Sequence, residues 1–242
     1  MKQKKFMDIS RIKKDTELTV ANTGGFHVGD HIVIQEKVDG SNSAIAYDKE
    51  TNKLVAFSRR QTLDYNNTLN GFWNWVQTLA VEPFSKYPNY VFFMEWLTKH
   101  TIKYIPEAYG KSYFYDVYDK KNECYLPQSE VKRLADELNL RYVQTFYDGE
   151  FISWEHCMSF MHKSDIAVNI PEGIVVKNQT ELNNPNSRTP FVLKIVNSQF
   201  SEIKKDNHKQ KIEDPQKLAA KAKASEIVEQ IVTKNRVQKE LY

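Results

Sequence analysis

Short runs of β-branched and aromatic residues, separated by turn residues, recur along the first 200 residues and constrain the possible fold most strongly. Such runs alternate apolar and polar positions over lengths typical of strands. The sequence therefore predicts a mixed α/β body with many short strands, part of it a meander. The predicted strands lie at 31–38, 43–48, 53–60, 89–97, 112–119, 172–178 and 190–197.

Two segments, 67–80 and 127–140, instead carry apolar residues at helical intervals, which predicts one amphipathic helix in each. In the second, Ser129 is the expected N-cap. The apolar positions of the first are Leu69, Phe72, Trp73, Val76 and Leu79. Those of the second are Val131, Leu134, Ala135 and Leu138.

The composition of the chain changes after Phe200. A polar stretch leads to Asp214-Pro215, a typical N-cap and first-turn pair, and a helix is expected to follow. Residues 203–242 carry 10 Lys and Arg against 6 Asp and Glu. We therefore expect two domains, a body at 1–202 and a short basic helical C-terminal appendage at 203–242.

Composition points away from membrane-spanning and disulfide-based proteins. Hydrophobic residues make up 40% and charged residues 27%, and no apolar run approaches the roughly 18–20 residues of a membrane span. The two cysteines, Cys124 and Cys157, give no disulfide framework and no zinc spacing. We expect a monomeric cytoplasmic protein without membrane contact.

Four charged residues interrupt the apolar strands: Lys37, Glu95, Glu172 and Lys194. A charge in an apolar strand is costly unless it is paired or faces a cleft. One interpretation is two Lys–Glu pairs that satisfy each other in the interior. The other is a reactive site.

The reactive interpretation needs a deprotonated lysine. Burial of Lys37 and a neighbouring cation such as Lys194 are expected to lower its pKa. Carboxylates hold a divalent cation, and lysines and arginines hold phosphates. Taken together, these residues favour phosphoryl or nucleotidyl transfer.

Six segments in order, "EKVDGSN", "SRR", "FMEWL", "FYDVYD", "EGIVVK" and "FVLKIVNSQFSE", resemble the motifs of covalent nucleotidyltransferases, the superfamily of polynucleotide ligases and mRNA capping enzymes. Within it the chain resembles the phage-type RNA ligases related to the T4 double-strand nick-sealing enzyme. The resemblance covers about residues 30–205. It implies an α+β fold: an antiparallel-sheet, ATP-grasp-like ligase adenylation domain that binds the nucleotide between its sheets.

The resemblance implies roles for the residues of the first two motifs. Lys37 is the expected nucleophile that takes AMP from ATP. Asn42 would orient the substrate 5′-phosphate, although a turn-capping role is the alternative. Arg59 would contact the nucleotide ribose or the substrate 5′-phosphate, with Arg60 as the alternative register. Glu36 would lie against the nucleotide.

The later carboxylates and aromatics receive roles in the same way. Glu95 would contact the ribose or support metal binding, and Glu172 would serve the metal-assisted catalytic steps. Tyr115, followed by Asp116, would stack on adenine. The pair Tyr118-Asp119 is the other register, and an ordinary core position is the alternative to both.

Lys177 and Lys194 fall at positions that contact nucleotide phosphate in the family, and Lys194 is counted among the catalytic residues. The last family motif usually has two lysines two residues apart, whereas this chain has Val196 at the second position. That departure puts the efficiency of adenylylation or transfer in question.

The resulting hypothesis is an ATP-dependent RNA ligase that uses Mg²⁺ or Mn²⁺ and acts in RNA repair on RNA ends, a nicked duplex or an RNA–DNA hybrid. A phage-like origin agrees with the resemblance. The rivals are a DNA ligase or capping-type enzyme, and a nucleic-acid-binding relative that has lost catalysis. The 42 residues after Phe200 are expected to be too few for the OB-fold domain of the first rival.

Overall fold

A computed structural model describes residues 3–12, 25–180, 182 and 191–200. The predicted appendage and its border after residue 202 lie outside these residues. In the part of the chain described, no helix is both long and apolar enough to cross a membrane.

The first sheet has five strands in the order β1-β10-β9-β2-β8. Strand β1 pairs with β10 in parallel, and the other pairs are antiparallel. A short helix, α5 (Trp154–Met158), contributes to the apolar cluster of this sheet. The strands are β1 (Ser10–Ile12), β2 (His31–Glu36), β8 (Thr145–Glu150), β9 (Gly173–Asn178) and β10 (Val192–Val196).

The second sheet is antiparallel throughout, in the order β4-β3-β5-β6-β7. Its strands are β3 (Ser41–Asp48), β4 (Lys53–Ser58), β5 (Tyr90–Leu97), β6 (Lys111–Asp119) and β7 (Cys124–Tyr125). Helices α2 (Phe72–Val76), α3 (Glu82–Ser85) and α4 (Gln128–Glu137) add to the apolar cluster on one face of this sheet. A single 3₁₀ turn, η1 (Pro106–Ala108), precedes β6.

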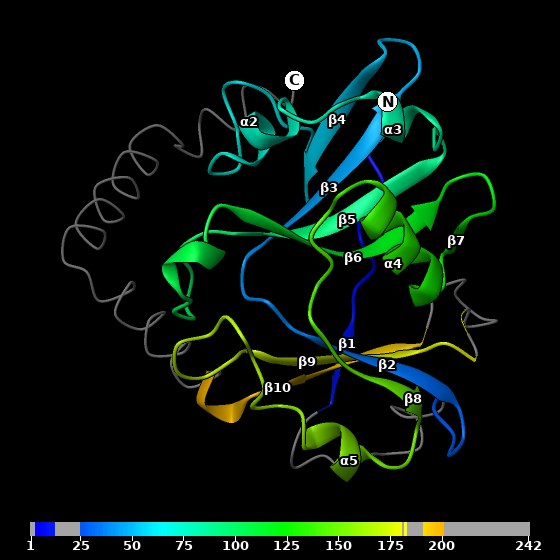
Figure 1. Cartoon of the computed structure of the whole chain (residues 1–242), viewed down its shortest axis with the longest axis vertical. Helices are drawn as coiled ribbons and strands as arrows, with labels where there is room; N and C mark the ends of the chain where they lie inside the picture. The colour runs from blue at the N-terminus through cyan, green and yellow to red at the C-terminus, as the bar shows by residue number, and fades with distance from the viewer. Residues whose placement is uncertain (1–2, 13–24, 181, 183–190, 201–242) are drawn as a thin grey trace, which may run out of the picture. The chain divides into compact units, whose positions relative to one another are not determined.

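Figure 1 shows the two sheets one above the other, with the chain passing from β2 to β3 between them. Strand β2 ends at Glu36 in the first sheet, and β3 begins at Ser41 in the second. Only residues 37–40 make this crossing. The crossing segment therefore faces the space where the two sheets meet.

The α+β prediction with antiparallel sheets is confirmed, and every predicted strand is present within a few residues of its expected ends. Two helix predictions need correction. The first helix spans only Phe72–Val76, because Leu69, Asn70 and Gly71 have positive φ angles that a right-handed helix cannot contain. Ser129 lies in the first turn of α4, and Pro127 takes the N-cap position.

A buried ion pair connects the two sheets. Lys177 of β9 places its Nζ 3.1 Å from Asp116 Oδ2 of β6, and both side chains are only 4% exposed. The same Nζ donates to the backbone carbonyl of Tyr115 at 2.7 Å. Gln128, at the start of α4, donates its side-chain amide to the other oxygen of Asp116 at 2.8 Å. Both charges are therefore paired and hydrogen-bonded, as burial requires.

We expect Asp116→Leu to lower the free energy of unfolding by about 3–5 kcal/mol, because it leaves the Lys177 ammonium buried without its counter-charge. The double variant Asp116→Leu/Lys177→Met should recover more than half of that loss. Urea unfolding of the three chains measures both effects. Lys132→Ala, which breaks an exposed ion pair with Asp136, is the control and should cost less than about 1 kcal/mol. A double variant as unstable as Asp116→Leu would contradict this account of the pair.

Candidate active site

The crossing segment that carries Lys37 is held by hydrogen bonds to the first sheet and to the segment that follows β5. The backbone N–H of Lys37 donates to the carbonyl of Gly173 at 3.0 Å, in the first sheet. Asp39 Oδ2 accepts from the backbone N–H groups of Thr101 and Ile102 at 2.9 and 3.0 Å. The segment "HTIKY" after β5 thus helps hold the lysine loop in place.

Gly40 is required where the crossing segment meets β5. A Cβ atom on Gly40 would lie 2.7 Å from the carbonyl oxygen of Trp96 and 2.9 Å from Cγ of Glu95. The backbone N–H of Gly40 donates to Glu95 Oε1 at 3.2 Å. The Asp and Gly of "KVDG" therefore position Lys37, and this is the physical reason for their places in the motif.

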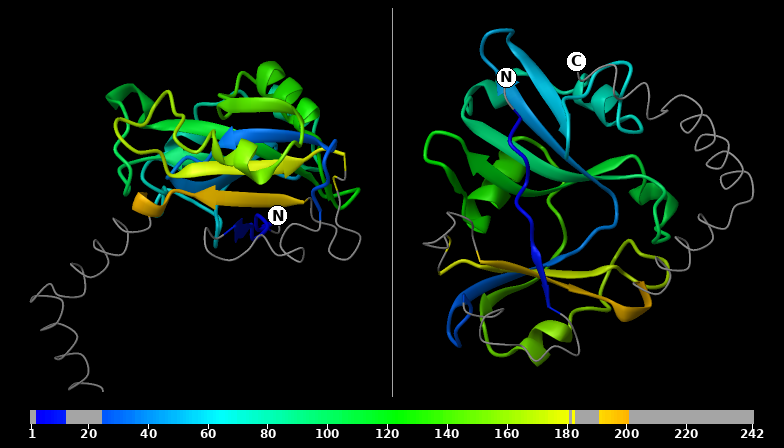
Figure 2. Two further views of the ribbon diagram at one scale, coloured as in Figure 1. Left: turned by 90° about the horizontal axis from the view of Figure 1, so that it is seen from below. Right: turned by 180° about the vertical axis from the view of Figure 1, so that it is seen from behind.

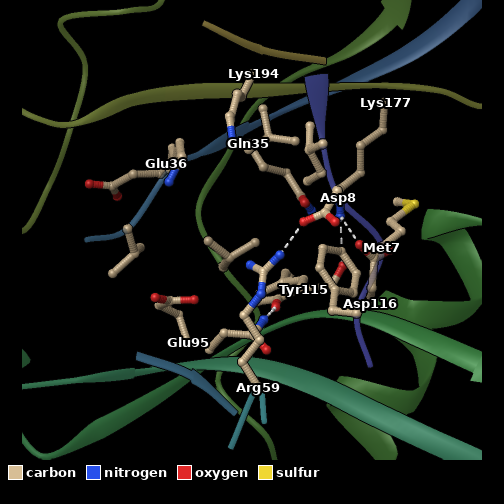
Figure 3. A pocket seen from close by; sticks show the side chains of 17 residues that line it. Met7, Asp8, Gln35, Glu36, Arg59, Glu95, Tyr115, Asp116, Lys177 and Lys194 are labelled. Carbon is tan, nitrogen blue, oxygen red and sulfur yellow. Dashed lines mark hydrogen bonds and ion pairs between the residues drawn. The ribbon is translucent and has the colours of Figure 1, made fainter. Parts of the chain in front are cut away.

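A pocket of about 200 Å³ lies between the two sheets (Figure 3). It brings together eight of the nine residues predicted for the site; the ninth, Glu172, contacts Lys37. The role of each residue stays a prediction. The eight are Glu36, Lys37, Asn42, Arg59, Glu95, Tyr115, Lys177 and Lys194. The other lining residues include Gln35 and the N-terminal residues Phe6, Met7, Asp8 and Ile9.

Lys37 forms an ion pair with Glu172, with Nζ 2.7 Å from Oε1. Burial, the largest single effect, lowers the pKa of Lys37, but Glu172, with Glu95 and Asp39, raises it by more. The net shift is upward, so the expectation of a lowered pKa is wrong. The pairing of Lys37 with a glutamate agrees with the first of the two interpretations drawn from the sequence. The lysine must lose this proton before it can attack a phosphorus atom.

Lys194 of β10 has the lowered pKa that was expected of Lys37. Burial is the main cause, followed by the positive charge of Lys37. Val196, two residues on, is partly buried and packs against an apolar cluster that includes Val38 and Leu97. The position where the family has a second lysine is thus an apolar one in this chain.

Glu95 and Glu36 are acidic groups with strongly raised pKa values. Burial raises the pKa of Glu95 to about 8, against the lowering effect of Lys37. Burial likewise raises the pKa of Glu36 to about 7, although a hydrogen bond from the Ser164 hydroxyl lowers it. Perturbed values of this kind concentrate at functional sites, because such sites hold charges away from water.

Glu95 and Glu172, the predicted metal ligands, both lie near enough to Lys37 to raise its pKa. Across residues 3–12, 25–180, 182 and 191–200, no group of three or more His, Cys, Asp or Glu side chains is arranged to hold a metal ion. Mg²⁺ is usually held by one or two carboxylates together with substrate phosphates. The two carboxylates fit a cation that binds with a nucleotide.

A β-bulge places Tyr115 and Asp116 in the same pocket. Along β6, Phe114 pairs with Met94 and Asp116 with the adjacent Phe93, so Tyr115 is an extra residue in the ladder. In a regular strand, consecutive side chains face opposite sides of the sheet. The bulge removes that alternation, and both residues line the pocket.

The alternative register, Tyr118-Asp119, lies elsewhere. Tyr118 is buried in an apolar cluster, and Asp119 accepts hydrogen bonds from the turn residues Lys121 and Asn122. Neither lines the pocket described here. Tyr115 is therefore the better placed of the two candidates for contact with a base.

Three predicted ligands already have protein partners. Lys177 is held by Asp116, as described above, so a phosphate contact would compete with a buried ion pair. Asn42 donates its amide to the Tyr115 hydroxyl. Arg59 pairs with Asp8 of the N-terminal segment. Of the Lys–Glu pairs considered from the sequence among Lys37, Glu95, Glu172 and Lys194, the pair Lys37–Glu172 is present.

Gln35 is a pocket residue that the sequence reasoning missed. It is 1% exposed, and its Oε1 has no hydrogen-bond partner within the described structure. Asp116 can only accept, so Gln128 turns its NH₂ toward Asp116 and its carbonyl toward the Gln35 NH₂, 3.0 Å away. The network thereby leaves the Gln35 carbonyl as a buried acceptor in a residue that lines the pocket.

Comparison with known proteins gives a family match. Residues 30–196, more than half of the chain, match the family model described as RNA ligase. No curated protein matches significantly.

Among solved structures, the fold is similar to an archaeal ATP-dependent RNA ligase, with a TM-score of 0.60, 19% identity, and coverage of 81% of this chain and 49% of that one. A Naegleria gruberi RNA ligase with PPi gives a TM-score of 0.57 at 18% identity, covering 84% and 58%. A mutant of that enzyme with ATP and Mn gives 0.57 at 17%, covering 82% and 57%.

The chain spans about half the length of the archaeal structures and somewhat more of the Naegleria structures. At identities below 25%, these structural similarities support the fold alone. None of these matches singles out the T4-related nick-sealing branch, which stays a prediction.

The raised pKa of Glu36 leads to a testable pH dependence. Ionisation of Glu36 costs more in the folded chain than in the unfolded chain, where the pKa is near 4.5. Its contribution to the free energy of unfolding should therefore fall as pH rises from about 4.5 to about 7 and stay low above that. Glu36→Gln removes the charge and keeps an acceptor for the Ser164 hydroxyl.

We expect Glu36→Gln to exceed the wild type in unfolding free energy by roughly 1–3 kcal/mol near about pH 8, and to match it near about pH 4. Urea unfolding at the two pH values measures the difference. A difference of the same size at both would show that ionisation of Glu36 is not its cause.

Proposed function

The chain belongs to the RNA ligase family, and on that premise we propose that it is an ATP-dependent enzyme that joins 3′-hydroxyl and 5′-phosphate ends of RNA. The observation that carries the proposal is the placement of Lys37. It lies on the four-residue crossing between the sheets, beside Glu172, in a pocket that Arg59 and Lys194 also line. A reactive amine among cations suits an anionic nucleotide.

The proposed reaction has three transfers. Lys37 Nζ attacks the α-phosphorus of ATP, loses a proton, forms a P–N bond and expels pyrophosphate. An oxygen of the RNA 5′-phosphate then attacks the same phosphorus, which breaks the P–N bond and transfers AMP to the RNA end. Finally the 3′-hydroxyl attacks the 5′-phosphorus, forms the phosphodiester and expels AMP.

We assign the side chains of the pocket to these steps according to their charge. Glu172 pairs with the Lys37 ammonium, and we assign it the role of orienting the nucleophile. Lys194 and Arg59 contribute positive charge for phosphate oxygens. A Mg²⁺ or Mn²⁺ ion bound by Glu95 and Glu172 would neutralise phosphate charge and compete with Lys37 for these carboxylates, which favours the neutral amine.

The Gln35 carbonyl has no hydrogen-bond partner among the described residues and belongs to a residue that lines the pocket, so we assign it to the base and expect adenine. The 6-amino group of adenine donates a hydrogen bond, whereas guanine carries a carbonyl at that position. A guanine carbonyl facing a buried acceptor leaves both groups unsatisfied, which costs about 1–3 kcal/mol. ATP should accordingly be preferred over GTP by roughly tenfold or more.

The RNA substrate follows from the family rather than from a geometric feature of this pocket. A nicked duplex, an RNA–DNA hybrid and single strands all present the same 5′-phosphate and 3′-hydroxyl chemistry. The T4-related branch suggests a nicked duplex. A DNA ligase or capping-type enzyme would use the same lysine. A capping-type enzyme should be labelled by GTP, whereas the proposed RNA ligase should be labelled by ATP.

Incubation with α-labelled ATP and magnesium, followed by denaturing electrophoresis and intact mass measurement, tests the proposal. We expect one AMP per chain on the wild type and none on Lys37→Ala, because Lys37 supplies the attacking nitrogen. Lys132→Ala removes a surface lysine that pairs with Asp136; it is the control and should label normally.

Labelling by GTP in preference to ATP would replace this proposal with the capping-type reading. A folded wild-type chain that carries no AMP and accepts none would instead favour a nucleic-acid-binding protein without catalysis. If AMP is transferred to DNA ends faster than to RNA ends, the enzyme is a DNA ligase.

A further inference from the structure

The N-terminal strap, residues 3–12, connects the two sheets across the pocket. Figure 2 shows it as the dark blue segment that runs from one sheet to the other. At one end, Ser10–Ile12 pairs in parallel with β10 of the first sheet. At the other end, Phe6 is buried against aromatic rings of the second sheet. Its ring centroid lies 5.0 Å from that of Phe93 and 5.1 Å from that of Tyr115.

Further contacts hold the strap in place around Phe6. The backbone N–H of Met7 donates to the Tyr125 hydroxyl at 3.1 Å. Lys4 Nζ lies 3.8 Å from the centre of the Tyr118 ring. Gln3 donates its amide to a backbone carbonyl at the end of β4. Lys5, next to the buried Phe6, is exposed at a position that these anchors fix.

The strap and the end of β4 together form a second pocket, here called the basic pocket. It is open and has a volume of about 380 Å³. The described residues that line it are Gln3, Lys5, Arg59 and Arg60. Three of these four are cationic. Because Arg59 also lines the nucleotide pocket, the basic pocket adjoins the site of the proposed reaction.

Asp8 is the carboxylate nearest this group of cations. It pairs with Arg59, and its Oδ2 lies 3.9 Å from Lys5 Nζ. The Asp8 side chain is 80% exposed, and ion pairs between exposed groups contribute little to stability. A phosphate group, with more charge and more acceptor oxygens, can displace it.

We propose that the basic pocket holds a backbone phosphate of the RNA strand beside the reacting end. This phosphate displaces Asp8 from its ion pair with Arg59. The inference rests on the proposed function, because it takes the neighbouring pocket as the nucleotide site. Exposed Lys and Arg side chains in an open groove are typical of contacts to a nucleic-acid backbone. Enclosed, largely apolar pockets are typical of small ligands.

The double variant Lys5→Ala/Arg60→Ala tests the pocket in the full chain. The probe is a fluorescent single-stranded RNA with a 5′-phosphate, titrated at several salt concentrations. We expect its affinity to fall about tenfold at low salt, and the slope of log K against log[salt] to become less steep by about 0.7, the value for one phosphate contact on a single strand. Lys49→Ala/Lys53→Ala removes the same charge from the hairpin between β3 and β4 and is the control.

Asp8→Asn tests the same pocket in the opposite direction. Without its charge, the carboxylate no longer competes for Arg59, so RNA affinity should rise about threefold at low salt and less at high salt. A misfolded variant would not bind more tightly. A loss in Lys5→Ala/Arg60→Ala no larger than in the control, or an Asp8→Asn chain that binds RNA no better than the wild type, overturns the proposal.

Self-adenylylation of the wild type, measured in parallel without RNA, separates this inference from the proposed function. A chain that labels with AMP but fails the binding comparisons is a ligase that grips RNA elsewhere. A folded chain that carries no AMP and does not label refutes the catalytic proposal whatever the RNA titrations show.

Discussion

The buried ion pair between Lys177 and Asp116 sets the relation between the two sheets on which the pocket depends. Removing two charges from water is expensive, so the pair is stable only with good geometry and further hydrogen bonds. The carbonyl of Tyr115 and the amide of Gln128 supply those bonds. Strands β9 and β6 are thereby held at one separation, and the pocket between the sheets is bounded by that contact.

Lys37 is the chemical counterpart of Lys177. Both lysines line the pocket and both pair with a carboxylate. The Lys177 side chain is 4% exposed and linked into a closed network, whereas that of Lys37 is 24% exposed and lies on a short crossing segment. The first arrangement suits structural support, because its charges are already paired and hydrogen-bonded. The second leaves a cation that an incoming nucleotide can reach.

Local irregularities do much of the positioning around these lysines. The bulge in β6 turns two consecutive residues, Tyr115 and Asp116, into the pocket, where a regular strand would present one. One of them faces the proposed base site and the other completes the buried ion pair. The strap also holds residues of the pocket, since Phe6 packs against Tyr115 while Asp8 pairs with Arg59.

The sequence by itself determined seven of the strands, the positions of the family motifs and eight of the residues that meet in the pocket. The strands follow from local periodicity, which acts over a few residues, and the pocket residues follow from the resemblance of the motifs to those of a known family. Only the tertiary structure decided that Lys177 pairs with Asp116, 61 residues away, that the pKa of Lys37 is raised, and that the Gln35 carbonyl has no partner among the residues that the structure describes. Each of these depends on which charged and polar groups the two packed sheets bring together. Local sequence patterns do not specify the distance between residues that lie far apart in the chain.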